Sequence, residues 1–337
     1  MVARGRTLCA PTWFSFTQRG ESMRHLFLIN PHAGRAGSTE ALRARIEAAM
    51  AGRDYAVSVA ERPGDVARLA RRAAEGGEEV RLYACGGDGT LNEAVNGAAG
   101  FPNAAVTNVP KGTGNDFLRI FGDRARFSDL EALADGPRAE FDLMDCNGRL
   151  GIGVVCAGVD ARVAADVHHY KALPLVGGTG AYVLSLAVNV LFRRLTRPVD
   201  LRMGPHHLTG ENTLICICNG RYYGGGFMPV GEAQPDDGVL DVLAVPRVSR
   251  LTFARLVGAY AKGRYRDYPR YIVDWHGDRV DFSSPEELVA VVDGEVMRAR
   301  AFTVRLSEKK VNFFYPPGLS WRRGAQPEQG AELALDR

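Results

Sequence analysis

The residues best suited to chemistry in this chain lie in the segment 85–97. It reads Cys-Gly-Gly-Asp-Gly-Thr-Leu-Asn-Glu-Ala-Val-Asn-Gly and directly follows an apolar run that begins at Val80. Glycines let the backbone approach a ligand closely, and free amides at the start of a helix bind phosphate. Asp88 adds a carboxylate where a metal ion or a transferring phosphoryl group needs one. No Gly-Lys-Ser/Thr follows, so this is not a Walker loop; the alternative is a tight turn with a capping aspartate.

Strand and helix patterns alternate through the first half of the chain and must position this segment. We expect strands at 25–29, 55–60, 80–85 and 104–109, and helices at 38–51, 64–75, 90–98 and 115–121. This alternation predicts an α/β domain with a Rossmann-like parallel sheet. Sites in such sheets lie beyond the carboxyl ends of the strands. The glycine-bearing turns 30–35, 86–90 and 110–116 should therefore converge on a nucleotide cleft.

Short β-rich segments dominate after about residue 140 and predict an all-β-rich second domain, an antiparallel sandwich or barrel. Helical patterns interrupt them near 160–170, 180–193 and 249–262. The expected strands are 141–146, 149–156, 198–203, 212–218, 238–245, 271–275, 278–283, 287–293 and 298–306. Residues 172–192 carry no charge, but Pro174 and the following glycine cluster interrupt them. A loop and a buried helix are expected there rather than a membrane span.

Composition agrees with two globular domains. The chain has 337 residues, 46% of them apolar and 24% charged, which is too long for one ordinary core. A net charge of +3 is too small to predict a nucleic-acid partner. The six cysteines form no Cys-x-x-Cys pair and most lie in apolar segments. They predict reduced thiols in a cytoplasmic protein.

Domain boundaries follow from these changes in pattern. Residues 1–23 are expected to be a disordered extension or a mis-assigned start, because Met23 directly precedes the first strand. Residues 24–143 form the nucleotide-binding α/β domain, and 144–307 the β-sandwich domain. Residues 308–318 are expected to pack back on the first domain, and the polar residues 319–337 to fray.

Further motifs extend the pattern from His25 to Pro316. In order, they are Asn30-Pro31-x-x-Gly34, Gly86-Gly87-Asp88-Gly89-Thr90-x-Asn92-Glu93, Gly112-Thr113-x-Asn115-Asp116-Phe117-x-Arg119, Asn219-Gly220-x-x-Tyr223-Gly224-Gly225-Gly226, Asp237-Gly238-x-Leu240-Asp241 and Asp293-Gly294-Glu295. Together they resemble the diacylglycerol kinase catalytic-domain family, which includes bacterial soluble lipid kinases and sphingosine kinases. NAD kinases share the first glycine-aspartate loop, but are not expected to carry the third and sixth motifs.

The resemblance implies an ATP-dependent lipid kinase with its active site in the cleft between the domains. ATP and Mg²⁺ would be the cofactors, and a diacylglycerol-like lipid the acceptor. Glu295 would be the general base that takes the proton of the lipid hydroxyl, and Asp88 would organise Mg-ATP. The residues implied to hold the nucleotide and its magnesium are Asn30, Gly87, Asp88, Gly89, Thr90, Leu91, Asn92, Glu93, Thr113, Asn115, Asp116, Arg119 and Asp142.

Several of these residues have an alternative structural role. Asn115 and Asp116 precede a helix pattern and could cap it. Arg119 could bind a phosphate with two hydrogen bonds, or it could pair with an acid such as Asp142. Asp293-Gly294 is also a strong hairpin-turn signal.

A second magnesium site is implied by the segment 234–241. By resemblance, Gln234 and Val239 would supply main-chain oxygens and Asp237 a carboxylate, a set suited to a hard cation. A hairpin turn with solvated acids is the alternative. Two departures from the family pattern stand out. Ala60 replaces a threonine that would contact the nucleotide, and Val-Gly-Glu at 230–232 replaces an Ala-Pro pair next to the second metal site.

Arginines alternate with apolar and aromatic residues in the segment 247–270. A basic amphipathic helix of this kind could lie on an anionic membrane surface, or simply cover its own sheet. Tyr222, Tyr223, Phe227 and Met228 could line an acyl-chain groove or pack as core. We expect a cytoplasmic protein with peripheral contact at the inner membrane surface, and a homodimer is compatible with the sequence.

Three functions remain open at this point. The first is the lipid kinase described above. The second is a kinase of a soluble polyol or dinucleotide, similar to NAD kinases. The third is a non-catalytic nucleotide- or lipid-binding regulator, against which the presence of both Asp88 and Glu295 argues.

Overall fold

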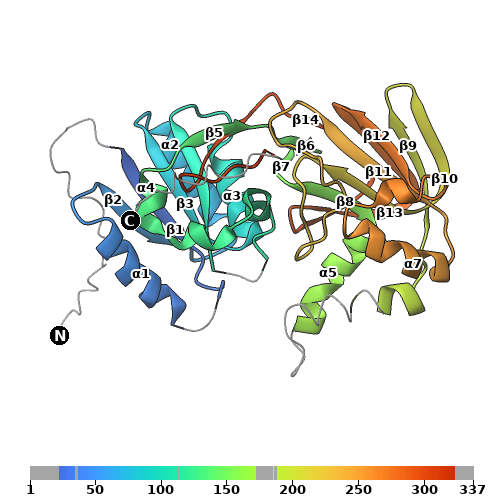
Figure 1. The fold of residues 1–337 in the computed structure, drawn as a ribbon, viewed down its shortest axis with the longest axis horizontal. Coiled ribbons are helices and arrows are strands. Elements are labelled where there is room, and N and C mark those ends of the chain that lie inside the picture. The colour runs from blue at the N-terminus through green and yellow to red at the C-terminus, as the bar shows by residue number, and fades with distance from the viewer. Residues whose placement is uncertain (1–22, 35–36, 112–113, 172–184, 186–187, 323–337) are drawn as a thin grey trace, which may run out of the picture.

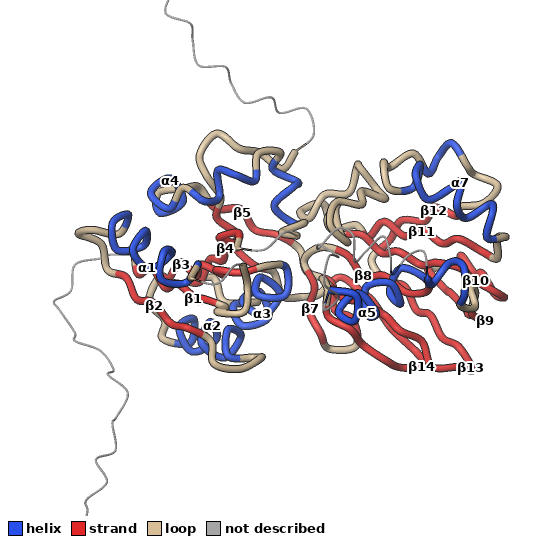
Figure 2. Tube along the Cα trace, turned by 90° about the horizontal axis from the view of Figure 1, so that it is seen from below, coloured by secondary structure: helices blue, strands red, loops and turns tan. Residues whose placement is uncertain are grey.

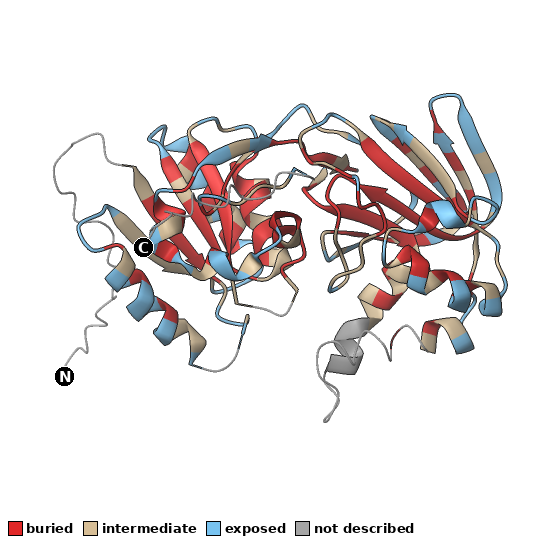
Figure 3. Cartoon of the chain, in the orientation of Figure 1, coloured by how far each residue is buried: buried red, intermediate tan, exposed pale blue. Residues whose placement is uncertain are grey.

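The computed structural model describes residues 23–34, 37–111, 114–171, 185 and 188–322. Two domains lie side by side, each built around its own sheet (Figure 1). Figure 3 shows buried residues concentrated along the strands of both sheets. Within the described residues, every helix is too short or too polar to span a bilayer. The five described cysteines are buried free thiols, as expected.

The first domain has a six-stranded sheet in the order β2-β1-β3-β4-β15-β5. All neighbours in it are parallel except β15 and β5. The strands are runs of largely apolar residues because helices cover both faces of the sheet. Their bounds are β1 Arg24–Ile29, β2 Tyr55–Val59, β3 Val80–Gly86, β4 Ala104–Pro110, β5 Arg138–Phe141 and β15 Val311–Phe314.

Helices α1 (Ser38–Ala49) and α4 (Leu130–Ala134) lie on one face of this sheet. Helices α2 (Asp65–Glu75) and α3 (Asp88–Ala98) lie on the other, as Figure 2 shows. The alternation predicted from the sequence is confirmed, with two corrections. Helix α3 begins two residues earlier than expected, at Asp88. The expected helix 115–121 is instead a short 3-10 helix, η1 (Phe117–Phe121), because Asn115 adopts a positive φ of 51° that excludes it from a helix.

The second domain is a nine-stranded antiparallel sheet in which β10 and β13 are the longest strands. Strands β8 and β9 both lie between these two. The segments expected as separate strands at 278–283 and 287–293 form the single strand β13, with an irregularity between Ser283 and Leu288. The bounds are β6 Met144–Cys146, β7 Arg149–Gly151, β8 Val154–Gly158, β9 Arg197–Met203, β10 His206–Cys218, β11 Leu240–Pro246, β12 Val273–Gly277, β13 Arg279–Val292 and β14 Glu295–Leu306.

Alternate residues of the second sheet enter two different cores, as the period of a strand requires. On β10, Ile215 and Ile217 join a core shared by most strands of the domain. Leu214 and Cys216 face the opposite way, into a core closed by helix α7 (Arg250–Tyr260). Helix α5 (Val159–Lys171) covers the same sheet near β8 and β13. Of the expected helix 180–193, residues 180–184, 186 and 187 lie outside the described residues.

The chain returns to the first domain at its end. Strand β15 lies between β4 and β5, so it completes the first sheet. Leu319 and Trp321 pack against the first core, and the ring of Trp321 meets Phe141 edge-on at a centroid distance of 5.1 Å. Residues 319–322, which the sequence assigns to a frayed tail, are thus held by aromatic packing.

Candidate active site

The three glycine-bearing turns of the first domain meet at the carboxyl ends of β1, β3 and β4. Nδ2 of Asn30 donates to the Thr90 hydroxyl at 3.1 Å. Lys111 donates through its Nζ to the carbonyl of Asn30 at 3.2 Å and through its backbone N–H to the carbonyl of Gly86 at 3.0 Å. The convergence predicted from the strand order is therefore present. Thr113 lies outside the described residues.

Asp88 occupies the first turn of α3, where the backbone amides have no partner within the helix. Its Oδ2 accepts a hydrogen bond from the backbone N–H of Asn115 at 2.9 Å, and its Oδ1 one from that of Asp116 at 2.6 Å. A Cβ at Gly114 would overlap the Asp88 carboxylate, so a larger residue there would displace that side chain. Burial, followed by repulsion from Asp116, raises the pKa of Asp88 to about 6.

Asp116 connects the two domains. Its carboxylate accepts from Nε of Arg119 at 3.0 Å and from the backbone N–H of Gly225, in the second domain, at 2.6 Å. Arg119 therefore pairs with Asp116. The alternative pairing of Arg119 with Asp142 is wrong, because Asp142 forms its ion pair with Lys310 at 3.0 Å.

Asp293 and Gly294 form the two-residue hairpin turn between β13 and β14, with φ values of 48° and 93°. Turns of this kind require positive φ at both positions, which favours Asp-Gly. The Asp293 carboxylate accepts from three consecutive backbone amides, those of Ile152, Gly153 and Val154, at 2.7 to 3.0 Å. It also accepts from Nδ2 of Asn92 on α3 at 3.2 Å. Burial raises the pKa of Asp293. The three amide bonds hold the turn within the second domain, and the bond from Asn92 links it to α3 of the first domain.

Glu295 follows this turn as the first residue of β14. Its side chain is 42% exposed and lies 3.3 Å from the Arg149 guanidinium. A Cβ placed on Gly89 would lie 3.2 Å from Oε1 of Glu295. The carboxylate thus faces the start of α3, although the two residues are far apart in the sequence.

Two of the expected nucleotide residues point elsewhere. Glu93 accepts hydrogen bonds from the backbone N–H groups of Gly64 and Val66, both at 3.1 Å, and so caps helix α2. Asp142 accepts from the backbone N–H of Gly238 at 2.9 Å and lies at the loop before β11. Neither residue lines the cavity beside Asp88, and Asn30, Thr90, Asn115 and Glu295 also lie outside its described lining. For Glu93 the reason is its position on α3. Asp88 and Asn92 lie four residues apart on one face of this helix, whereas Glu93 lies on another face.

The expected second metal loop lies next to Asp142. Within it, the backbone N–H of Val239 donates to Oδ1 of Asp237 at 3.0 Å, and the carbonyl of Pro235 accepts from the backbone N–H of Asp142 at 2.6 Å. Burial raises the pKa of Asp237, with further contributions from Asp236 and Asp142. Among the described residues, no three His, Cys, Asp or Glu side chains cluster as metal ligands. Gln234 and Val239 would have to act through carbonyls.

A cavity of about 620 Å³ runs from Asp88 into the second domain. Its polar end is lined by residues from both domains, among them Gly87, Asp88, Gly89, Asn92, Asp116, Arg119, Arg124 and Asp293. Its other end lies between the second sheet and helices α5 and α7. The lining there is largely apolar and includes Cys156, Val159, Val163, Leu214, Val245, Phe253, Leu256, Val257 and Ile272.

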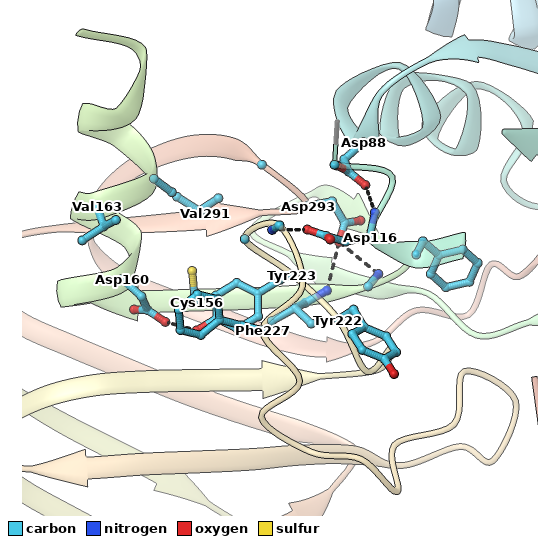
Figure 4. A pocket seen from close by; sticks show the side chains of 18 of the residues that line it. Asp88, Asp116, Cys156, Asp160, Val163, Tyr222, Tyr223, Phe227, Val291 and Asp293 are labelled. Atoms are coloured by element: carbon cyan, nitrogen blue, oxygen red, sulfur yellow. Dashed lines mark hydrogen bonds between the residues drawn. The ribbon is translucent and has the colours of Figure 1, made fainter. Parts of the chain in front are cut away.

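Sequence reasoning missed one polar group in the apolar end. Asp160, on the second residue of α5, accepts from the Tyr223 hydroxyl at 2.8 Å. The Tyr260 hydroxyl lies 3.1 Å from that of Tyr223. Figure 4 shows Asp160 and Asp116 on opposite sides of Tyr223. The only available signal was an acid at the start of a helix pattern, which by itself indicates a favourable helix dipole.

Comparisons with known proteins follow the domain division closely. Residues 24–146 match the model of the diacylglycerol kinase catalytic domain, and residues 153–314 match that of the YegS C-terminal NAD kinase beta sandwich-like domain. A Pseudomonas aeruginosa protein described as "Probable lipid kinase YegS-like" is 30% identical over 301 residues, which are 86% of this chain and 94% of that protein. The chain belongs to the diacylglycerol kinase-like family of lipid kinases.

Other members of the family agree with this assignment. A diacylglycerol kinase of Staphylococcus aureus is 28% identical over 81% of this chain and 86% of its own length. The crystal structure of a diacylglycerol kinase from Bacillus anthracis superposes with a TM-score of 0.66 at 19% identity, covering 90% of this chain and all of that one. This last likeness shows the shared fold.

The polar end of the cavity fits the cofactors of a phosphotransferase. The carboxylates of Asp88, Asp116 and Asp293 all line it, and their mutual repulsion contributes to the raised pKa of Asp88. A divalent cation would relieve that repulsion. Mg²⁺ takes one or two carboxylates together with phosphate oxygens and water, so this oxygen set is chemically suitable.

Proposed function

We propose that this protein is an ATP-dependent kinase that transfers the γ-phosphate of Mg-ATP to a hydroxyl of a diacylglycerol-like lipid. The observation that carries the proposal is the single cavity that joins a carboxylate- and amide-rich end to an apolar end. An amphiphile fits such a cavity with its hydroxyl at the polar end and its acyl chain between α5, α7 and the sheet. A soluble polyol or dinucleotide would leave the apolar end unfilled, which argues against the second function.

The first domain would hold the donor. The free amides of Asp88, Gly89 and Thr90 at the start of α3 would bind phosphate oxygens, aided by the helix dipole. Asp88 and Asp116 would hold Mg²⁺, which neutralises charge on the phosphates. Asn30, Thr113 and Asn115 would complete this side from the neighbouring turns. Glu93 and Asp142 would act indirectly, through the cap of α2 and the loop before β11.

The second domain would supply the acceptor and the base. Glu295 is exposed enough to meet a lipid hydroxyl and faces the start of α3. As a carboxylate it would take the proton of that hydroxyl while the oxygen attacks the γ-phosphorus. Arg149 would hold the carboxylate in position. Asp293, bound by four donors, would fix the turn that presents Glu295.

Contact with a membrane would deliver the lipid. Leu191, Phe192 and Leu251 are 59%, 80% and 63% exposed, unusual values for large apolar side chains. Arg250, next to Leu251, donates to the carbonyl of Arg193, so α7 and residues 190–193 lie together. Arginines beside exposed apolar residues suit an anionic bilayer surface. We place this contact at the inner surface of the cytoplasmic membrane.

Kinase activity in mixed micelles tests the proposal. The purified protein with Mg-ATP should phosphorylate diacylglycerol, and the panel should include monoacylglycerol, sphingosine, ceramide, phosphatidylglycerol and, without micelles, NAD. Asp88→Asn and Glu295→Gln should each lower kcat at least about 100-fold, because charge neutralisation and proton transfer are lost. Glu308→Gln, an exposed acid outside the cavity, is the matched control. Full turnover in both site variants, or activity on NAD alone, would contradict it.

A further inference from the structure

Arg124 brings a positive charge to the polar end of the cavity. It is the first residue of the 3-10 helix η2 (Arg124–Ser128), and its half-buried side chain lines the cavity together with Asp88. Its Nη1 donates to the backbone carbonyl of Gly114 at 2.9 Å. A guanidinium has five N–H donors in a fixed plane. One hydrogen bond therefore leaves most of these donors available to a ligand.

The charge of Arg124 is not balanced by a neighbouring acid. Arg119, the other arginine near Asp116, forms an ion pair with that residue at 3.0 Å, so its charge is compensated within the protein. Arg124 forms no ion pair with any of the residues that the structure describes. An arginine of this kind suits an anionic ligand, because its planar donors match the oxygens of a carboxylate or a phosphate.

Arg124 and Asp88 lie on two sides of the same glycine. The carbonyl of Gly114 accepts from Arg124, whereas a Cβ placed on Gly114 would overlap the Asp88 carboxylate. The backbone N–H groups of the next two residues, Asn115 and Asp116, donate to that carboxylate. A phosphate that reaches a metal ion at Asp88 is therefore also close to the Arg124 guanidinium.

The short helix that carries Arg124 is held firmly in place. Asp123 caps it by accepting from the backbone N–H of Ala125 at 3.1 Å. The fully buried ring of Phe127 lies 5.2 Å from that of Phe121. Arg126 donates to the carbonyl of Pro317 at 2.8 Å. A charged group on a fixed element needs little reorganisation when charge develops on a substrate, which favours catalysis.

We propose that Arg124 is a catalytic residue that binds the terminal phosphate of the nucleotide. This inference rests on the proposed kinase function. The transferred phosphate must enter the cavity that holds the acceptor, and Arg124 lines that cavity whereas Lys111 does not. The γ-phosphorus leaves the oxygen of ADP and bonds to the lipid oxygen, whose proton passes to Glu295. The Arg124 guanidinium balances negative charge on the phosphoryl oxygens during this transfer.

Nucleotide binding without lipid tests the contact itself. With Mg²⁺ present, calorimetry should show that Arg124→Gln weakens ATP binding about tenfold or more, because a charge-assisted contact is lost. Binding of ADP and AMP, which lack the terminal phosphate, should change less than about twofold, and this also shows that the variant is folded. Glutamine removes the charge but keeps an amide donor for the Gly114 carbonyl. Unchanged ATP affinity, or equal losses for all three nucleotides, would overturn the assignment.

Turnover with diacylglycerol and Mg-ATP tests the catalytic role. Arg124→Gln should lower kcat at least about 100-fold. Arg124→Lys, which keeps the charge but not the planar donors, should lose less. In Arg124→Ala, added guanidinium ion should restore part of kcat, as a purely structural role would not allow. Arg126→Gln, an exposed arginine on the same helix outside the cavity lining, should keep the kcat and the ATP affinity of the wild type.

The two experiments separate this inference from the function on which it rests. If no lipid is phosphorylated but the loss of affinity in Arg124→Gln is still confined to ATP, the lipid kinase proposal fails and the phosphate contact stands. If lipid is phosphorylated and Arg124→Gln has the kcat of the wild type, the kinase proposal stands and the role of Arg124 is overturned.

Discussion

At the scale of single residues, the cavity is defined by two unusual carboxyl groups at its two ends. Asp88 lies beside two other carboxylates, so its pKa of about 6 reports burial and crowding of negative charge. Among the described residues no other carboxylate contributes to the shift of Asp160, and its pKa of about 7 reflects burial above all. Both pKa values are raised, but for different reasons. Only the crowding of carboxylates at Asp88 indicates a place for a cation.

The raised pKa of Asp160 predicts how stability depends on pH. The folded protein holds a proton on Asp160 up to a pKa of about 7, whereas the unfolded chain releases it near the ordinary aspartate pKa of 3.8. Stability from this group is therefore present at low pH and is lost as pH rises towards 7. Asp160→Asn removes that loss. From pH 5 to pH 8 the free energy of unfolding of Asp160→Asn should rise by about 2 kcal/mol relative to that of the wild type.

Urea unfolding of both proteins at pH 5, 6, 7 and 8 measures this difference. Asp166→Asn serves as the control, because its carboxylate is held by an arginine at the surface side of the same helix. Parallel stability profiles for the wild type and Asp160→Asn would show that the group titrates normally in the folded protein.

At the scale of elements, helix α3 contacts three neighbouring parts of the protein, each through a different face. Asp88 and Asn92 face the second domain, Thr90 contacts Asn30 on the turn after β1, and Glu93 caps α2. Packing against α2 is close, because a Cβ at Gly97 would overlap the backbone of Ala67. A single helix therefore sets the relative positions of its own N-terminal amides, the hairpin turn and α2.

The cap formed by Glu93 gives a prediction about stability rather than nucleotide binding. Glu93→Ala leaves the amides of Gly64 and Val66 without their acceptor, and should lower the free energy of unfolding by about 1 to 2 kcal/mol. The KM for ATP should change less than about twofold, because Glu93 does not line the cavity. Glu47→Ala, an exposed acid on α1, is the control. A large rise in KM with unchanged stability would restore Glu93 to the nucleotide site.

Sequence patterns predicted the elements well and the side-chain directions less well. The alternation of apolar runs with helix patterns located the strands of the first sheet, because packing on both faces requires such runs. It could not show that Asn115 adopts a positive φ, which shortens the following helix. It also could not show which way Glu93 points, since a motif fixes spacing and not the neighbour on each helix face. The sequence did not indicate that Asp160 lies in the cavity, because its partner Tyr223 lies on a loop far away in the chain.

At the scale of the whole molecule, the two domains are joined near the site by hydrogen bonds as well as by covalent crossings of the chain. Asp116 binds the amide of Gly225, and Asn92 binds Asp293 across the same boundary. The Arg221 guanidinium donates to the carbonyl of Trp321 at 2.7 Å. The final described residues thus connect the second domain to the aromatic core of the first.

Truncations test the role of this final segment. A chain ending at Arg322 is the reference for the shorter truncation, because it keeps Trp321 and the ion pair of Arg322 with Asp236. A chain ending at Gly318 loses the ring of Trp321 from Phe141 and Tyr315, and should lose about 2 to 3 kcal/mol of stability and several degrees of Tm. Trp321→Phe, which keeps a ring, should lie between the two. Equal Tm values for all four proteins would show that the contact contributes nothing.

The position of β15 has a consequence for the order in which the protein can be made. The strand that fills the gap between β4 and β5 leaves the ribosome only after the whole second domain. Until then, the growing first domain exposes two unpaired strand edges, which invite association with other chains. The whole second domain is, in effect, an insertion within the first. A translation product that ends before β15 would therefore lack a finished first domain even if its second domain were complete, and would be an early target for chaperones and proteases.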